Sequence, residues 1–181
     1  MARGEVGDAA SVDLRPVIDA EPDDLRVSLT SIVHWADSTP VRREVMQAVA
    51  FPHDDMGMFL VVNQLTYNGA MRPAELVQVL GATPTNMSKI VGRLVESGLV
   101  VRVAAPDDDR GVLVALTEAG REIGARICDR ASANLAETLA GWSRDDAATL
   151  RRLLARLART TTARTAAGVL PDPRSERTRT P

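Results

Sequence analysis

Apolar residues recur every three to four positions along most of the chain, which is the spacing that lines one face of a helix. The first such segment covers 25–36 and is ended by Pro40, because the residue before a proline is pushed out of helical geometry. A short second helix is expected over 41–49. The third is capped by Asp54 or Asp55 and ends where a Tyr-Asn-Gly sequence supplies turn residues.

Two short helices separated by a tight turn follow. The first covers 73–80, starts with Pro73 and is ended by Gly81, which provides a left-handed stop. The second covers 84–97, with Thr83 as its N-terminal cap and a proline in its first turn. Two helices joined in this way form a helix-turn-helix candidate.

The pattern then changes from helical to β. Two β-branched runs, 99–103 and 112–116, are separated by the polar loop 105–111, and this arrangement predicts a hairpin. A helix-turn-helix followed directly by a two-stranded hairpin is a winged helix. Thr117 caps a long helix and Ser143 caps the last one, so the predicted fold is mainly α with a small β-hairpin.

The composition is that of a globular protein. Of the 181 residues, 45% are hydrophobic and 25% are charged, which suits one folded domain with appendages. No apolar run approaches the ~20 residues of a membrane span, and the first residues do not form a secretory signal, so we expect a cytoplasmic protein. The single cysteine, Cys128, and the two histidines, His34 and His53, exclude an intrachain disulfide framework and a closed zinc site.

The negative charge is concentrated at the N-terminus. The formal net charge is −2 and the isoelectric point about 5.7, whereas nucleic-acid-binding proteins are usually basic. Residues 1–24 hold seven acidic and two basic side chains, a net charge of −5. The segments 25–167 and 168–181 carry +2 and +1. We therefore expect 1–24 to be a flexible acidic leader on a mildly basic protein.

The helix predicted over 84–97 carries side chains suited to nucleic acid. Four apolar positions form its buried face: Met87, Ile90, Val91 and Leu94. Five polar residues remain mostly on the outside: Thr85, Asn86, Ser88, Lys89 and Arg93. Hydroxyl and amide groups bond base edges, and the two cations bond guanine or phosphate. An ordinary solvated helix face is the alternative explanation, and the adjoining hairpin favours nucleic acid.

The loop of the hairpin has a single arginine among carboxylates. The run Asp107-Asp108-Asp109-Arg110 is poorly suited to unspecific phosphate binding, but one carboxylate can hold the guanidinium of Arg110 in a planar pose that enters a minor groove. The turn propensity of aspartate explains Asp107 and Asp109 well, and Asp108 less well. The positive and negative charges across 83–112 cancel. Affinity for nucleic acid therefore has to come from individually placed side chains and from the use of two copies of the site.

These segments resemble the MarR family of bacterial transcription regulators. The resemblance is carried by Met71-Arg72-Pro73-Ala74-Glu75-Leu76, by the run from Thr83 to Leu94, and by Glu96-Ser97-Gly98-Leu99-Val100. The stretch from Asp107 to Gly120 looks like the Asp-x-Arg wing and the Leu-Thr-x-x-Gly continuation of that family. The resemblance is specific over about residues 55–122 and looser in the flanking helices. Gly92 departs from the family, in which a polar or acidic residue is commoner.

The resemblance implies a homodimeric regulator of transcription that binds a specific double-stranded DNA sequence. It implies dimerisation helices over 25–50 and 118–167 around a DNA-binding domain over 55–117, and we expect 168–181 to be a flexible tail. It also implies that Asp108 orients Arg110 in the minor groove. The expected DNA-contacting residues are Arg72, Thr83, Thr85, Asn86, Ser88, Lys89, Arg93, Asp108 and Arg110. A two-fold axis predicts half-sites about 10 base pairs apart, an inverted-repeat operator and a modest salt dependence.

Many proteins of this family release DNA when a small molecule binds between the dimer helices and the winged domain. The corresponding ligand candidates are His34, Trp35, Met46, Met58 and Tyr67, although a core or interface role suits each of them better. Repression is the expected mode of regulation because it is the usual one in the family. No cofactor is expected.

A winged helix that contacts another protein is the alternative function, and it would leave Lys89 and Arg110 dispensable. An enzyme is not expected, because the sequence has no paired carboxylates at helical spacing beside an apolar pocket and no phosphate-binding glycine loop. Cys128 and the run His53-Asp54-Asp55 are weak candidates for redox and metal sensing, and neither activity is expected.

Overall fold

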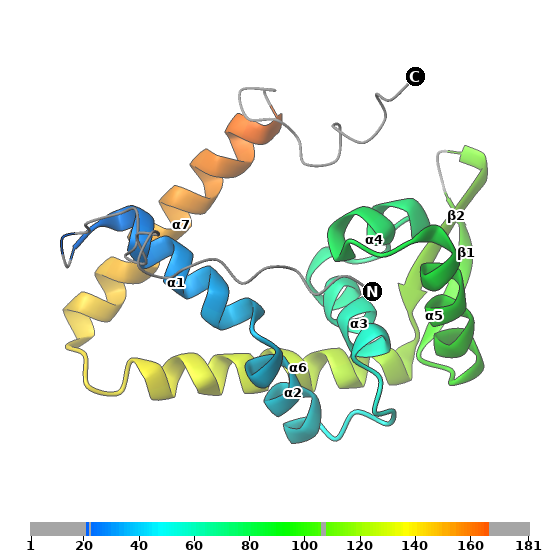
Figure 1. The fold of residues 1–181 in the computed structure, drawn as a ribbon, viewed down its shortest axis with the longest axis horizontal. Helices are drawn as coiled ribbons and strands as arrows, with labels where there is room; N and C mark the ends of the chain where they lie inside the picture. Colours follow the sequence, from blue (N-terminus) through cyan, green and yellow to red (C-terminus); the bar gives the residue numbers. More distant parts are fainter. Residues whose placement is uncertain (1–20, 22, 106–107, 167–181) are drawn as a thin grey trace, which may run out of the picture. The chain divides into compact units, whose positions relative to one another are not determined.

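The computed structural model describes residues 21, 23–105 and 108–166, of which 108–110 and 162–166 are described by their backbone alone. The described chain runs through α1 (Leu25–Asp37), α2 (Thr39–Ala48), α3 (Met56–Asn68), α4 (Pro73–Leu80), α5 (Pro84–Glu96), β1 (Val100–Ala105), β2 (Asp108–Leu116), α6 (Glu118–Thr138) and α7 (Arg144–Ala166) (Figure 1). The predicted flexible tail, and all but the last residues of the predicted leader, lie outside the described residues. No helix within the described ranges is long and apolar enough to cross a membrane.

The described elements confirm the predicted order of helices and hairpin. Helix α2 starts two residues earlier than predicted, because Pro40 lies in its first turn, where a missing N–H breaks no helical hydrogen bond. The hairpin is longer than predicted, since β1 reaches Ala105 and β2 begins at Asp108. Asp55 rather than Asp54 caps α3: its Oδ1 accepts the backbone N–H of Met58 at 3.0 Å.

The chain divides within α2 into two units, residues 1–42 and 43–181. In the first unit, Asp24 caps α1 by accepting a backbone N–H of the first turn at 2.8 Å. Asp37 forms an ion pair with Arg42 across the turn that follows α1. Helix α1 contains no buried residue, although several of its exposed side chains are large and apolar. Within the described residues of the first unit, the apolar face of α1 is therefore left uncovered.

The core of the second unit lies where α3, α4, α5, the base of the hairpin and the start of α6 meet. Its most deeply buried side chains are Val61, Val62, Leu65, Leu76, Met87, Val91, Leu94 and Val114. None of the polar side chains in the described part of the chain is buried there. Burial of this apolar area, at about 25 cal/mol per Å², holds α5 against α3 and α4. The same packing decides which side of α5 faces outward.

A second, short pairing anchors the hairpin to the segment before α4. Strands β1 and β2 pair antiparallel, with Val100 opposite Leu116. Beyond them, the N–H of Met71 donates to the carbonyl oxygen of Val114 at 3.0 Å, and the N–H of Val114 donates back to the carbonyl oxygen of Met71 at 2.8 Å. The residue two positions before α4 is thus bonded directly to strand β2.

The junction between β2 and α6 depends on Thr117 and Gly120. The hydroxyl of Thr117 accepts the N–H of Gly120 at 3.1 Å, which caps α6, and donates to the carbonyl oxygen of Gly98 at 2.6 Å. A Cβ on Gly120 would lie 2.1 Å from the carbonyl oxygen of Leu99, so only glycine fits this approach. These contacts give the Leu-Thr-x-x-Gly sequence a physical reason: it joins the hairpin closely to the long helix.

Candidate nucleic-acid interface

Helix α5 is positioned by its first residues and by its buried face. The hydroxyl of Thr83 accepts the backbone N–H of Asn86 at 3.2 Å and so caps the helix. Four apolar side chains, each at most 5% exposed, pack into the core: Met87, Ile90, Val91 and Leu94. At 3.6 residues per turn, Thr85, Lys89 and Gly92 lie together on the opposite face.

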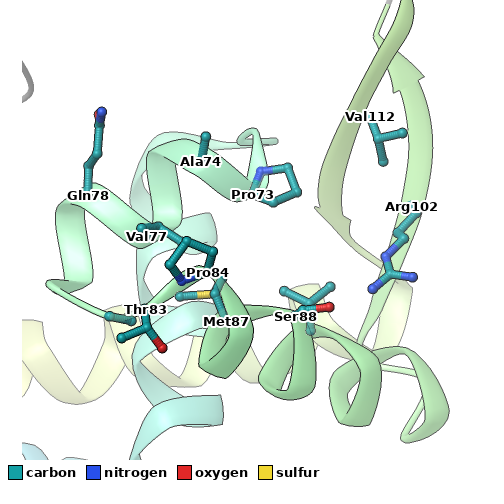
Figure 2. Close-up of a pocket in the computed structure, with 12 residues that line it drawn as sticks. Pro73, Ala74, Val77, Gln78, Thr83, Pro84, Met87, Ser88, Arg102 and Val112 are labelled. Carbon is teal, nitrogen blue, oxygen red and sulfur yellow. The ribbon is translucent and has the colours of Figure 1, made fainter. Parts of the chain in front are cut away.

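The outward face brings together most of the DNA-contacting residues predicted on this helix. Thr85, Asn86, Ser88 and Lys89 are all exposed. Thr85 and Lys89 lie near the middle of the face, and Asn86 lies on the flank that it shares with Ile90. Ser88 lies on the other flank, toward the hairpin (Figure 2). Hydroxyl, amide and ammonium groups are therefore presented over the first two turns of one helix.

Two further predicted residues of the helix-turn-helix, Arg72 and Thr83, lie at helix N-termini. Arg72 precedes α4 and is half-buried, and the carboxylate of Glu75 accepts its backbone N–H at 2.7 Å. Gly81 ends α4 with φ 61°, and Thr83 begins α5 two residues later. Arg72 and Thr83 are thus placed beside backbone N–H groups that can face an anion.

The predicted minor-groove contact falls at the edge of what the structure describes. The backbones of Asp108 and Arg110 belong to strand β2, whereas their side chains and the whole of Asp107 lie outside the described residues. The orienting role expected of Asp108 toward Arg110 therefore stays a prediction.

One predicted DNA-contacting residue, Arg93, forms an ion pair with an acidic residue of the same chain. Its Nη1 lies 2.7 Å from Oδ2 of Asp55, the residue that caps α3. Burial raises the pKa of Asp55, but the N–H of Met58 and the charge of Arg93 outweigh this effect, so the pKa lies below its ordinary value. The pair joins α5 to the first turn of α3, a contact between residues 38 positions apart.

An open cavity of about 880 Å³ separates α4 and α5 from the hairpin (Figure 2). Most of its wall is apolar, with Pro73, Val77 and Met87 among the lining residues. Arg102 of β1 and Ser88 of α5 supply polar groups on the side of the hairpin. Arg102 was not among the predicted site residues. The sequence did contain a signal, because an arginine interrupts an otherwise apolar strand.

The five ligand candidates are not alike in their surroundings. Met46 and Met58 belong to the core of the second unit, at 5% and 2% exposed. Tyr67 is exposed near the end of α3; partial burial raises the pKa of its phenol, and the neighbouring thiol of Cys128 raises it further. His34 and Trp35 are exposed on α1, in the first unit. The described ranges hold no group of three His, Cys, Asp or Glu side chains that could bind a metal ion.

Comparisons with known proteins agree on one family. The family model described as "MarR family" matches residues 59–111, which cover α3 from its fourth residue, α4, α5 and most of the hairpin. The multiple antibiotic resistance protein MarR of Salmonella typhimurium is 32% identical over 100 residues, which make up 55% of this chain and 69% of that protein.

Solved structures of the same family have the same fold. Wild-type MarR from E. coli, in its apo form, matches with a TM-score of 0.58 and 26% identity, covering 76% of this chain and 98% of that one. A MarR family transcriptional regulator from Listeria monocytogenes, solved in complex with 26mer DNA, matches with a TM-score of 0.53 and 18% identity, covering 76% and 88%. The sequence match and the shared winged helix-turn-helix lead to one conclusion: this chain belongs to the MarR family of transcriptional regulators.

Proposed function

We propose that the protein is a homodimeric repressor that binds an inverted-repeat operator in double-stranded DNA and leaves it when a small molecule binds. The observation that carries this proposal is the outward face of α5, where Thr85 and Lys89 are exposed one turn apart. The Listeria regulator that was solved with DNA shares the fold, which supports the same use of it here. A regulator of this kind acts in the cytoplasm, where it meets chromosomal DNA.

The proposed contacts divide between the two grooves. In the major groove, Asn86 is suited to adenine and Lys89 to guanine or phosphate, and the hydroxyls of Thr85 and Ser88 bond either bases or phosphate. In the minor groove, Arg110 inserts its guanidinium, oriented by Asp108. The backbone phosphates are bound near Arg72 and Thr83, at the N-termini of α4 and α5.

Exposed apolar side chains on the first and last helices support a dimer. The largest of them on α1 and α7 are Leu25, Ile32, Val33, Trp35, Leu153, Leu154 and Leu157. Exposed apolar side chains that are gathered on one helix generally mark an interaction site. We assign 25–50 and 118–167 to dimerisation and 55–117 to DNA binding. The variant Leu154→Glu is expected to sediment as a monomer with unchanged helix content.

The cavity between α5 and the hairpin supports release by a small molecule. Its volume of about 880 Å³ suits a drug-sized ligand, and Arg102 would favour one that carries a carboxylate. Because Ser88 and Val112 line it, a ligand there would occupy the gap between the two parts that approach DNA. The ligand candidates expected from the sequence, His34, Trp35, Met46, Met58 and Tyr67, are less favoured because Met46 and Met58 are buried.

Fluorescence anisotropy with duplexes from the protein's own promoter region tests the DNA-binding role. Lys89→Ala and Arg110→Ala should each weaken specific binding about tenfold or more, since a placed base contact is worth about 1–3 kcal/mol. Arg15→Ala removes the same charge from a position outside the segments assigned to dimerisation and DNA binding, and serves as the matched control. Two chains per duplex and a two-fold symmetric footprint are expected.

The same measurement separates the alternative function. A winged helix that contacts only another protein predicts that all three variants bind the promoter no differently from the wild type. A footprint on a single half-site without a repeat would contradict the proposed inverted-repeat operator.

A further inference from the structure

The carboxylate of Asp55 makes contacts in two directions. Its Oδ1 accepts the N–H of Met58 at 3.0 Å, which fixes the first turn of α3. Its Oδ2 lies 2.7 Å from Nη1 of Arg93, in the third turn of the recognition helix α5. The side chain of Asp55 is 25% exposed, so this charge-assisted contact is partly shielded from solvent.

A second contact between the same two helices lies next to this ion pair. Gly57 of α3 lies so close to Ile90 of α5 that a Cβ built on the glycine would be 2.9 Å from Ile90 Cδ1. Ile90 and Arg93 are three residues apart and therefore occupy the same flank of α5. The first turn of α3 thus holds that flank by one apolar and one ionic contact.

This placement separates Arg93 from the residues that face outward. Lys89 lies one turn before Arg93 and has its side chain exposed on the outer face. The side chain of Arg93 is also exposed, at 52%, but its guanidinium is directed to α3, where Asp55 provides a charged acceptor. Because an α-helix moves largely as one body, a contact at Arg93 affects the orientation of the whole helix, including the direction in which Thr85 and Lys89 point.

We propose that Asp55 and Arg93 are positioning residues, which hold the recognition helix at the angle needed for specific DNA binding, and that Arg93 does not itself bind DNA. This inference rests on the proposed DNA-binding role of α5. It assigns a function to Asp55, an acidic side chain close to a surface that has to accept phosphates.

The variant Asp55→Asn tests the proposal by the sign of its effect. Asparagine still caps a helix, so α3 keeps its start. Loss of a negative charge near the DNA surface would by itself tighten binding, whereas loss of the ion pair should weaken specific binding, about tenfold. Asp54→Asn is the matched control, because it removes an equal charge from the exposed neighbouring position and is expected to tighten binding slightly or leave it unchanged.

A double-mutant cycle with Arg93→Gln supplies the second readout. If the two residues act as one pair, the double variant should bind specific DNA no more weakly than either single variant. The dependence of log affinity on log salt concentration should keep its slope in Arg93→Gln. A residue bound to phosphate would lower that slope by about 1 when replaced.

Thermal unfolding of each variant should be followed by circular dichroism. The binding measurements are then made at a temperature at which every variant is fully folded. Tighter or unchanged binding by Asp55→Asn, additive losses in the cycle, or a reduced salt slope for Arg93→Gln would each overturn the proposal. Lys89→Ala separates it from the proposed function. If Lys89→Ala loses binding and Asp55→Asn does not, only the positioning role is wrong; if Lys89→Ala binds normally, the DNA-binding face itself is misassigned.

Discussion

The hydroxyl of Thr117 donates a hydrogen bond of 2.6 Å to the carbonyl oxygen of Gly98, and so joins the residue before α6 to the turn after α5. The same oxygen accepts the N–H of Gly120 at 3.1 Å. One side chain therefore satisfies a helix N-terminus and a carbonyl group 19 residues earlier in the sequence. Strands β1 and β2 leave and return through this point, which fixes the base of the hairpin.

Thr117→Val should therefore destabilise the protein. Valine keeps the shape of the side chain but provides neither the cap nor the donor, a loss of about 1–2 kcal/mol in the free energy of unfolding. Urea denaturation measures it. Thr149→Val, at an exposed position on α7, should change stability by less than about 0.5 kcal/mol. Equal effects of the two substitutions would show that the hydroxyl of Thr117 is not a structural contact.

Alanine should have opposite effects at two glycines. At Gly120 its Cβ would meet the carbonyl oxygen of Leu99, so α6 must shift, at a cost of about 2–3 kcal/mol. At Gly92, inside α5, a Cβ has no neighbour within 4 Å, and alanine should stabilise the helix by about 0.5–1 kcal/mol. Melting temperatures of Gly120→Ala and Gly92→Ala should move in opposite directions. A shift of the same sign in both would contradict this account.

Ala50→Gly should stabilise the turn after α2. Ala50 has φ 49°, the left-handed region, and its N–H donates to the carbonyl oxygen of Gln47 at 3.0 Å in a helix C-terminal motif. Glycine removes the steric penalty of the left-handed conformation but has more conformational freedom in the unfolded chain. The net effect should raise the free energy of unfolding by about 0.5–1 kcal/mol. Ala48→Gly, within the same helix, should be destabilising by a similar amount. Chemical denaturation of both variants tests this difference.

The ion pair of Asp55 should give stability a defined dependence on pH. Because its pKa is lower in the folded than in the unfolded protein, the stabilisation is complete above the unfolded value of about 4 and is lost as pH falls through the folded value. At neutral pH the wild type should be more stable than Asp55→Asn, and the difference should shrink as pH is lowered below about 4. A difference independent of pH would mean that the carboxylate is not the stabilising form.

Local signals in the sequence were sufficient to predict most elements. Thr83 and Thr117 were recognised as caps, and Asp55 as one of two candidates beside Asp54, because a cap acts on backbone groups two or three residues away, which the sequence displays directly. The left-handed stop at Gly81 was readable for the same reason. The extension of the hairpin to Ala105 and Asp108 was missed, since polar loop residues can continue a two-stranded ladder when the strands already pair.

Contacts between distant residues could not be predicted in this way. Arg93 was expected on the DNA-facing side because its helical position lies near the outer face, and only the packing of α3 shows the carboxylate of Asp55 beside it. Met46 and Met58 were named as ligand candidates with a core or interface role preferred, and the structure places both in the core. Whether a methionine lines a cavity or fills a core depends on the elements packed around it, and the sequence does not state these.

The pair of hydrogen bonds between Met71 and Val114 fixes the hairpin at one point, just before α4. A rotation of the hairpin about this point would move its tip by a larger distance than its base. From Val114 to the start of β2 at Asp108 the strand extends about 20 Å at ~3.3 Å per residue. A rotation of about 6° about this point would therefore move the tip by about 2 Å, which is enough to break a hydrogen bond. The pairing of Met71 with Val114 would thus set the distance between the proposed minor-groove contact at the tip of the hairpin and the proposed major-groove contacts on α5.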